Sequence, residues 1–172
     1  AVRLDPSIVS LIREVIVMGG SYNVQNSAPE FNMRCDPEAA EIVLHAGWQV
    51  NVLGLDVTRR VHCSRRDFSS LSERHPAVAL LRVQAAGWIS RVEGMGWEQD
   101  GCALHDAVAA AYLVDETLFQ TEQVSVEVEL QDRNSRGLTR FHPPAENRQI
   151  VNVITGVDVA KCRDLIWSYI EQ

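Results

Sequence analysis

The chain has 172 residues, of which 46% are hydrophobic, and a formal net charge of −7 at pH 7. This length suits one domain with a substantial core, and the acidic balance argues against nucleic acids and anionic membranes as partners, because both bind basic surfaces. No stretch approaches the ~18 apolar residues of a membrane span, so we expect a protein that engages neither a membrane nor a nucleic acid.

Four cysteines, Cys35, Cys63, Cys102 and Cys162, are scattered along the chain without a CxxC pair. Zinc ligands come at short spacings, and disulfide frameworks are typical of small secreted domains, so this pattern favours free thiols in a reducing compartment. No basic-then-apolar leader opens the chain. We therefore expect a cytoplasmic protein.

The amino-terminal part of the chain predicts a βαβ unit. An apolar strand at residues 15–18 is followed by a helix at 37–45, for which Asp36 is suited as the N-cap, and then by an alternating strand at 49–53. Strand, helix and strand at this spacing favour parallel pairing with a right-handed crossover.

The rest of the chain predicts further elements of the same domain. Residues 64–95 are expected to be helical with a break at His75-Pro76. The side chains expected to face inward from this segment are Ala77, Leu80, Leu81 and Trp88. The other expected elements are, in order, a helix at 107–113, a strand at 123–130 with one wet face, strands around Phe141 and at 149–154, and a helix that begins near Asp158.

The loop after the first strand is rich in amides, because it contains Asn23, Asn26, Glu30 and Asn32. In an open α/β sheet such a loop lies at the carboxyl edge of the strands, where these folds bind ligands. Amides donate and accept hydrogen bonds while a carboxylate only accepts, so the set suits vicinal hydroxyls. A surface loop rich in turn-forming residues is the alternative interpretation.

Several motifs, in order along the chain, resemble the inosine-uridine-preferring nucleoside hydrolase family. They are MGG at 18–20, PEFN at 29–32, DPEAA at 36–40, GLDVT at 54–58, LHD at 104–106, SRG at 135–137 and NV at 152–153. The family pattern is close to MGGxYxxGNxxPxAEFNxxxDPEAA. This chain departs from it by a shorter loop, by PEFN in place of PxAEFN, and by Gln25 where Gly is usual.

One family signature has no counterpart in this sequence, the amino-terminal aspartate cluster of the form DxDxGxDD. The chain therefore resembles the carboxyl-terminal portion, residues 1–172, of a single nucleoside hydrolase-like domain. The resemblance implies an α/β fold with an open, mostly parallel (mixed) sheet that is flanked by helices and incomplete on its amino-terminal side.

The activity that the resemblance implies is hydrolysis of the N-glycosidic bond of a ribonucleoside, which gives a free base and ribose. In this family calcium activates a water molecule, and Asp106 corresponds to a calcium ligand that also contacts a ribose hydroxyl. Calcium takes six to eight oxygen ligands, so the resemblance places the others in the absent amino-terminal half.

The same resemblance implies roles for four further residues. Asn26 and Glu30 would hold the 5′-hydroxyl, and Asn32 would hold a ring hydroxyl nearer the metal. His105 would assist departure of the base as a proton donor, for which the ordinary pKa of histidine near neutrality is suited. Taken without the resemblance, a His-Asp pair at a helix start is more often explained by an aspartate that caps the helix.

Three interpretations follow from these motifs. The chain is a nucleoside hydrolase half that works when joined to its missing half, a non-catalytic fragment or descendant that keeps a ribose-binding loop without the calcium site, or a plain α/β interaction domain. The third is disfavoured, because a scaffold does not require five polar residues at these spacings. The expected partners are a ribonucleoside and either the missing half or further copies in a dimer or tetramer, and the chain alone is expected to be inactive.

Overall fold

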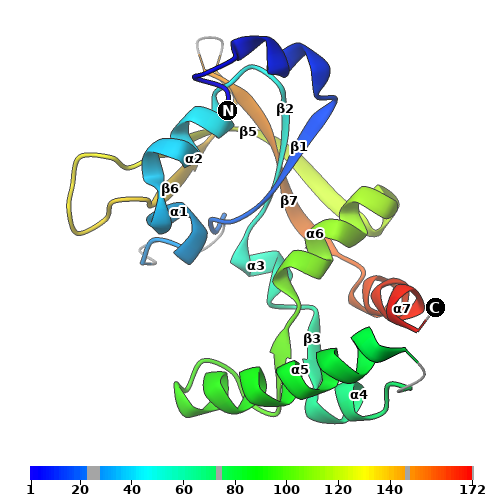
Figure 1. The fold of residues 1–172 in the computed structure, drawn as a ribbon. Helices are drawn as coiled ribbons and strands as arrows, with labels where there is room; N and C mark the ends of the chain where they lie inside the picture. The colour runs from blue at the N-terminus through cyan, green and yellow to red at the C-terminus, as the bar shows by residue number, and fades with distance from the viewer. Residues whose placement is uncertain (23–27, 73–74, 146–147, 172) are drawn as a thin grey trace.

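A five-stranded mixed sheet forms the centre of the molecule (Figure 1). The computed structural model describes residues 1–22, 28–72, 75–145 and 148–171. The strand order is β1-β2-β7-β5-β6. In chain order the bounds are β1 Glu14–Met18, β2 Gln49–Leu53, β5 Phe119–Val128, β6 Thr139–His142 and β7 Ile150–Val157.

The expected βαβ unit is confirmed. β1 pairs in parallel with β2 from Glu14↔Gln49 to Met18↔Leu53, and the connection contains α1 (Phe31–Cys35) and α2 (Pro37–Leu44). Asp36 caps α2 as expected, because its carboxylate accepts the N–H of Ala39 at 3.0 Å. β2 also pairs in parallel with β7, whereas β5 is antiparallel to both β7 and β6, so the sheet is mixed.

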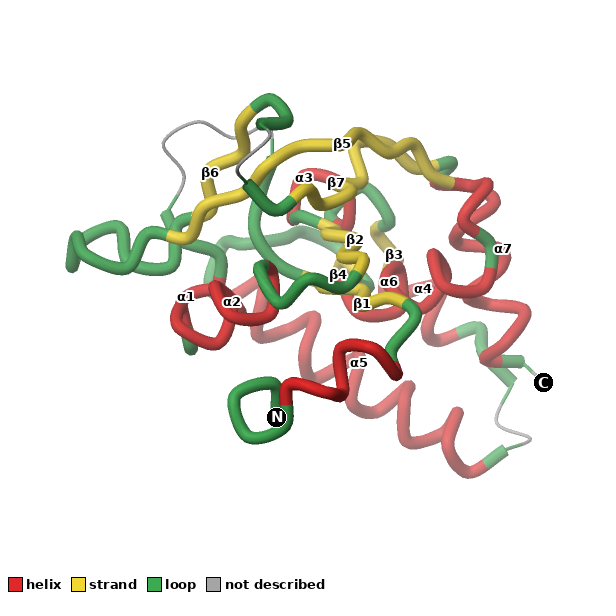
Figure 2. The backbone as a smooth tube through the Cα atoms, turned by 90° about the horizontal axis from the view of Figure 1, so that it is seen from above, coloured by secondary structure: helices red, strands yellow, loops and turns green. Residues whose placement is uncertain are grey.

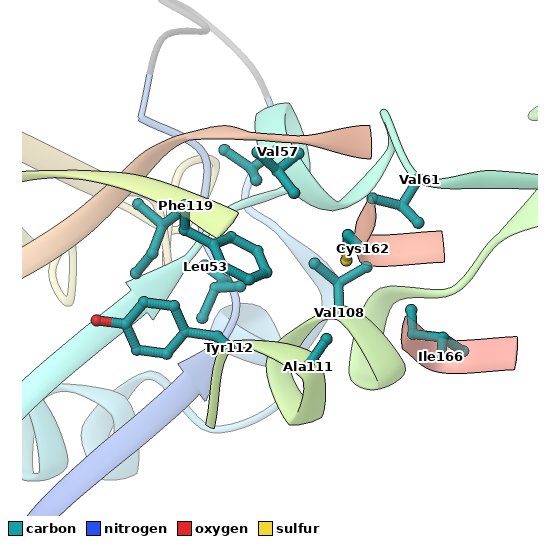
Figure 3. Packing of buried hydrophobic residues seen from close by; sticks show 11 residues of the cluster. Leu53, Val57, Val61, Val108, Ala111, Tyr112, Phe119, Cys162 and Ile166 are labelled. Atoms are coloured by element: carbon teal, nitrogen blue, oxygen red, sulfur yellow. The ribbon is translucent and has the colours of Figure 1, made fainter. Parts of the chain in front are cut away.

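Helices cover both faces of this sheet (Figures 1 and 2). α1 and α2 lie on one face over Val50, Val52 and the alternate side chains of β5 and β7. On the other face lie α6 (His105–Val114) and α7 (Val159–Ile170), which pack against Leu53 and Ile154. Figure 3 shows this second core. The alternation of strand side chains between two buried faces therefore fixes where each helix lies.

The chain between β2 and α6 forms a smaller layer outside the main sheet. It contains α3 (Leu55–Thr58), β3 (His62–Ser64), α4 (Arg65–Ser69), α5 (Pro76–Gly94) and β4 (Gly101–Ala103). β3 and β4 pair antiparallel, and Figure 1 shows them below the main sheet beside α5. The layer carries the chain back to the sheet at the start of α6, which holds two of the expected site residues.

The expected inward face of α5 is largely wrong. Leu80 and Trp88 are exposed, at 57% and 48% of their surface. The buried side chains of α5 are Val78, Ala85, Ile89 and Val92. The helix turns this other face inward because it packs against α4 and β4, which supply Phe68 and Cys102 to the same cluster.

The remaining elements are two short 3-10 helices, η1 (Pro6–Leu11) before β1 and η2 (Glu116–Leu118) before β5. Together the sheet and its flanking helices confirm the expected fold class. Within the described residues, no helix is long and apolar enough to cross a membrane.

Candidate functional site

The carboxyl ends of β1 and β2 form a common edge of the sheet. The N–H of Gly19 donates to the carbonyl of Leu53 at 3.0 Å, and the N–H of Leu55 donates to the carbonyl of Gly20 at 2.9 Å. Gly20 has φ +74, and a Cβ atom there would come within 2.8 Å of Thr139 Oγ1. The positive φ and the close approach to Thr139 both favour glycine, so the MGG motif ends in the residue that the turn out of the sheet needs.

Glu30 lies at this edge, in contact with Gly20, and is 8% exposed. Its Oε2 accepts the N–H of Met33 at 3.1 Å, which caps α1, and the N–H of Gly20 at 3.3 Å. The other carboxylate oxygen, Oε1, has no hydrogen-bond partner among the described residues. Glu30 therefore ties the helix to the end of β1 with one oxygen and keeps the second for another donor.

Asn32 lies on the first turn of α1 and is exposed. Its Nδ2 donates to the carbonyl of Met18 at 3.1 Å, so the side chain is held against the end of β1. Of the loop residues expected to contact a sugar, Asn26 lies outside the described residues, as does Asn23. The structure thus brings Glu30 and Asn32 to the same edge.

His105 is the first residue of α6 and reaches this edge from the neighbouring layer. Its Nδ1 lies 2.8 Å from Oγ1 of Thr58, the last residue of α3, which follows directly after β2. α3 and α6 pack together through the fully buried side chains of Val57 and Val108 (Figure 3). The imidazole is therefore fixed at the end of β2, although the two residues lie 47 positions apart in sequence.

Burial and four charged residues act on the pKa of His105. Burial lowers the pKa of the imidazole below its ordinary value, and Arg59 acts in the same direction. The carboxylates of Glu98, Asp106 and Glu30 oppose this effect and raise the pKa, with Glu98 the strongest of the three. Of the three carboxylates Glu30 has the smallest effect. The N–H of Leu55 donates to the carbonyl of Gly20, so the end of β1 that holds Glu30 lies beside the end of β2 that leads to Thr58 and His105.

Asp106 does not cap α6. The N-cap position belongs to Leu104, which has no capping side chain, and Asp106 stands in the first helical turn. Its side chain is exposed and makes no hydrogen bond or ion pair to a described residue. The helix dipole stabilises a carboxylate at this end, and the carboxylate oxygens remain available to a ligand.

Metal-ligating side chains do not cluster around Asp106 in the described residues. Across the parts of the chain that the structure describes, no three His, Cys, Asp or Glu side chains lie close enough together to hold a metal ion. Because calcium takes six to eight oxygen ligands, the carboxylate of Asp106 is far short of a complete set.

Asp56 follows β2 and has a structural role. Its Oδ1 accepts the N–H of Tyr22 at 2.9 Å and faces the hydroxyl of Ser21 at 3.5 Å, so it holds the start of the loop that follows β1. Its Oδ2 is buried without a partner in the described part of the chain. Two residues near His105 had no role in the sequence interpretation, Thr58 and Glu98. Thr58 belongs to the GLDVT motif, which was a usable signal, whereas Glu98 lies in no motif.

Comparisons with known proteins identify relatives of this chain in sequence and in fold. A family model described as "Inosine-uridine preferring nucleoside hydrolase" matches residues 1–164. The chain is 31% identical over its whole length to the inosine-uridine preferring nucleoside hydrolase of Crithidia fasciculata, of which it covers 56%. It is 34% identical over 94% of its length to the Leishmania major protein of the same name, of which it covers 53%.

Among solved structures, the fold is similar to a plant nucleoside hydrolase. The TM-score is 0.89 at 25% sequence identity, over 99% of this chain and 57% of the plant enzyme. The chain therefore spans about half the length of the proteins that it matches. The matched residues, the sequence identity and the fold lead to one conclusion: the chain belongs to the inosine-uridine preferring nucleoside hydrolase family.

Proposed function

We propose that this chain supplies the carboxyl-terminal half of a ribonucleoside hydrolase, which cleaves the N-glycosidic bond to give a free base and ribose. The observation that carries the proposal is the convergence of Glu30 and His105. They lie 75 positions apart in sequence, yet Glu30 accepts the N–H of Gly20 after β1 and His105 contacts Thr58 after β2, so both reach the edge at the carboxyl ends of the two strands. A hydroxyl-binding carboxylate beside a hydrogen-bond donor suits a sugar that carries a leaving base.

The sugar is held by groups on the β1 side of the edge. Glu30 Oε1 accepts a hydrogen bond from the 5′-hydroxyl, and the carbonyl oxygen of the Asn32 amide accepts one from a ring hydroxyl. Asn26 assists Glu30, by resemblance alone, because it lies outside the described residues. Contacts of this kind orient the substrate and strengthen as the sugar approaches the oxocarbenium-like transition state.

The base leaves on the side of His105. Cleavage of the glycosidic bond leaves negative charge on the base nitrogen and positive charge on the sugar carbon. An imidazole N–H directed at the base stabilises that negative charge by hydrogen bonding or by proton donation. Burial of His105 strengthens this contact, since hydrogen bonds are stronger where water is excluded.

The water-activating part of the site is proposed to lie largely outside this chain. Asp106 contributes one carboxylate ligand for calcium, and the other ligands come from the amino-terminal half. A calcium ion bound there would supply an acidified water molecule as the nucleophile. Because the described residues lack the remaining ligands, we propose that the chain alone is inactive.

The free edge of β1 is the docking place that we propose for the missing half. β1 pairs with β2 on one side and with no described strand on the other. All five of its residues are only partly buried, although the strand reads Glu-Val-Ile-Val-Met. A groove of about 240 Å³ beside it is lined by Val17, Met18 and the apolar side chains of α2. An unpaired parallel strand of this composition is expected to acquire a partner.

Joining the two halves tests the proposal. We expect the chain alone to release no ribose from inosine or uridine, and the chain co-expressed with the amino-terminal half of the Leishmania relative to do so. Asp106→Asn should abolish this activity, whereas Asp164→Asn, an exposed aspartate on α7, should preserve it as the matched control. Activity of the chain alone, or an inactive joined protein with correct folding, would contradict the proposal.

A further inference from the structure

Thr58 makes the contact that fixes the orientation of the His105 ring. The residue is 0% exposed and ends α3. Its Oγ1 lies 2.8 Å from His105 Nδ1 and 3.2 Å from the carbonyl oxygen of Gly54. A hydroxyl has one hydrogen to donate, so only one of these two contacts receives it.

The surroundings of Gly54 decide which contact that is. The Gly54 carbonyl already accepts the N–H of Thr58 at 3.1 Å and the N–H of Val57 at 3.2 Å. A carbonyl oxygen has two lone pairs, and both are occupied by these donors. The distance to the imidazole is also the shorter one and lies at the usual value for an O–H donor. These contacts favour Nδ1 of His105 over the Gly54 carbonyl as the acceptor of the hydroxyl hydrogen.

From this geometry we propose that Thr58 is a positioning residue, which donates its hydroxyl hydrogen to Nδ1 of His105 and thereby holds the imidazole in the tautomer that carries its hydrogen on Nε2. An imidazole nitrogen that accepts a hydrogen bond has no hydrogen of its own, so the neutral ring must carry it on the other nitrogen. His105 Nε2 has no hydrogen-bond partner among the described residues. Within the described part of the chain, Nε2 is thus the ring nitrogen left for a ligand.

The consequence for catalysis rests on the proposed function. With the hydrogen on Nε2, the neutral ring presents a donor to the departing base before any proton is taken up from solvent. With the opposite tautomer, Nε2 would be an acceptor and would repel the lone pair that the base nitrogen gains. The hydroxyl of Thr58 therefore determines whether His105 meets the base with the correct polarity, although it does not touch the substrate itself.

A purely structural role for the hydroxyl is the competing explanation. Serine and threonine in helices often donate to the carbonyl four residues earlier, which here is Gly54. In that arrangement Oγ1 would accept a hydrogen from Nδ1, and the ring would carry no hydrogen on Nε2. The two explanations assign opposite tautomers to the same residue, so a spectroscopic measurement separates them.

The first test uses the 172-residue chain with ¹⁵N-labelled histidine. Long-range ¹H–¹⁵N correlation spectra at pH 8 distinguish the tautomers, and the spectrum of His105→Gln assigns the signal. We expect the Nε2–H form in the wild type and in Thr58→Ser, which keeps the hydroxyl. We expect a mixture in Thr58→Val, which keeps the shape. Hydrogen on Nδ1 in the wild type, or a folded Thr58→Val with an unchanged tautomer, would overturn the proposal. If Thr58→Val does not fold, the wild type and Thr58→Ser still decide.

The second test uses the joined protein. Loss of one hydrogen bond in Thr58→Val should lower kcat for inosine about 3–10-fold, with little change in KM. Hydrolysis of p-nitrophenyl riboside should be nearly unchanged, because its leaving group departs without a donor, and Thr58→Ser should restore the rate for inosine. An equal loss for both substrates would replace the positioning role by a packing role. A joined protein inactive in every form would overturn the proposed function and leave the tautomer assignment standing.

Discussion

The buried carboxylate of Glu30 gives the most quantitative prediction, because it has a structural task that can be measured without substrate. Its Oε2 receives the N–H groups of Gly20 and Met33 at 3.3 Å and 3.1 Å. A hydrogen bond to a charged group contributes about 1.5–3 kcal/mol, and loss of an N-cap side chain costs about 1 kcal/mol. Because the two contributions share one oxygen, we expect Glu30→Ala to lower the free energy of unfolding by about 2–4 kcal/mol.

Glu30→Gln should cost less. The amide oxygen can still accept one N–H of the pair, while the charge is lost, so we expect a decrease of about 1–2 kcal/mol in the free energy of unfolding. The exposed Glu171 provides the control, and Glu171→Ala should change stability by less than about 0.5 kcal/mol.

The assay is urea unfolding of the 172-residue chain, followed by tryptophan fluorescence and far-UV circular dichroism. With a slope of about 2 kcal/mol per molar urea, the midpoint should fall by about 1–2 M for Glu30→Ala and by about half of that for Glu30→Gln. Equal midpoints for Glu30→Ala and Glu171→Ala would refute the assignment of Glu30 as the tie between α1 and β1. The residue would then be free to serve the ligand with both oxygens.

Three further predictions concern the metal, the leaving group and pH. Calorimetry should detect no calcium site with a Kd below about 10⁻⁵ M in the chain alone, whereas addition of the amino-terminal half should create one. Tight binding by the chain alone would mean that the calcium ligands lie within these residues. His105→Ala in the joined protein should slow hydrolysis of natural nucleosides about 10²–10⁴-fold and that of p-nitrophenyl riboside much less, and an equal loss for both would exclude a role in base departure. The ion pair and hydrogen bond from Arg140, together with two backbone N–H groups, lower the pKa of Glu129 to about 2. Since the pKa of Glu129 is lowered in the folded state, its stabilising contribution is present above the ordinary pKa of 4.5 and is lost as pH falls towards 2. Glu129→Gln should therefore weaken the decrease in the free energy of unfolding over this pH range. An unchanged decrease would show that the ion pair contributes nothing.

The parts of the fold that the sequence predicts correctly have local signals. β1, α2 and β2 combine a periodic apolar pattern with a glycine stop or a capping residue, as at Asp36, and each was found within a residue or two of its bounds. Patterns of this kind depend on contacts within a few positions of the chain. They are visible without knowledge of the neighbours.

The parts that sequence alone could not predict depend on distant contacts. β3 and β4 have three residues each. They pair in the sheet, with Cys63 opposite Cys102, although α5 lies between them in the chain. The buried face of α5 is set by packing against other elements, so its mixed apolar sequence alone predicts the wrong inward side chains. Such choices are made by tertiary contacts and override local periodicity.

The candidate site, like the fold, has features that the sequence indicates and features that depend on distant contacts. Motif order identified Glu30, Asn32, His105 and Asp106, but their hydrogen bonds could not be read from it. The bond of Glu30 to the N–H of Gly20 and the contact of His105 with Thr58 join segments that only the folded sheet edge brings together. Sequence therefore indicates candidate residues through the resemblance, and the structure shows what the described ones touch.

The central claim is that the edge formed by the carboxyl ends of β1 and β2 is a nucleoside site. The most direct measurement is a crystal structure of the joined protein with a ribonucleoside analogue whose glycosidic bond resists hydrolysis. The account predicts a ribose hydroxyl within hydrogen-bond distance of Glu30 Oε1 and the base within reach of His105 Nε2. An analogue bound elsewhere, or bound at this edge with Glu30 and His105 turned away from it, would contradict the account.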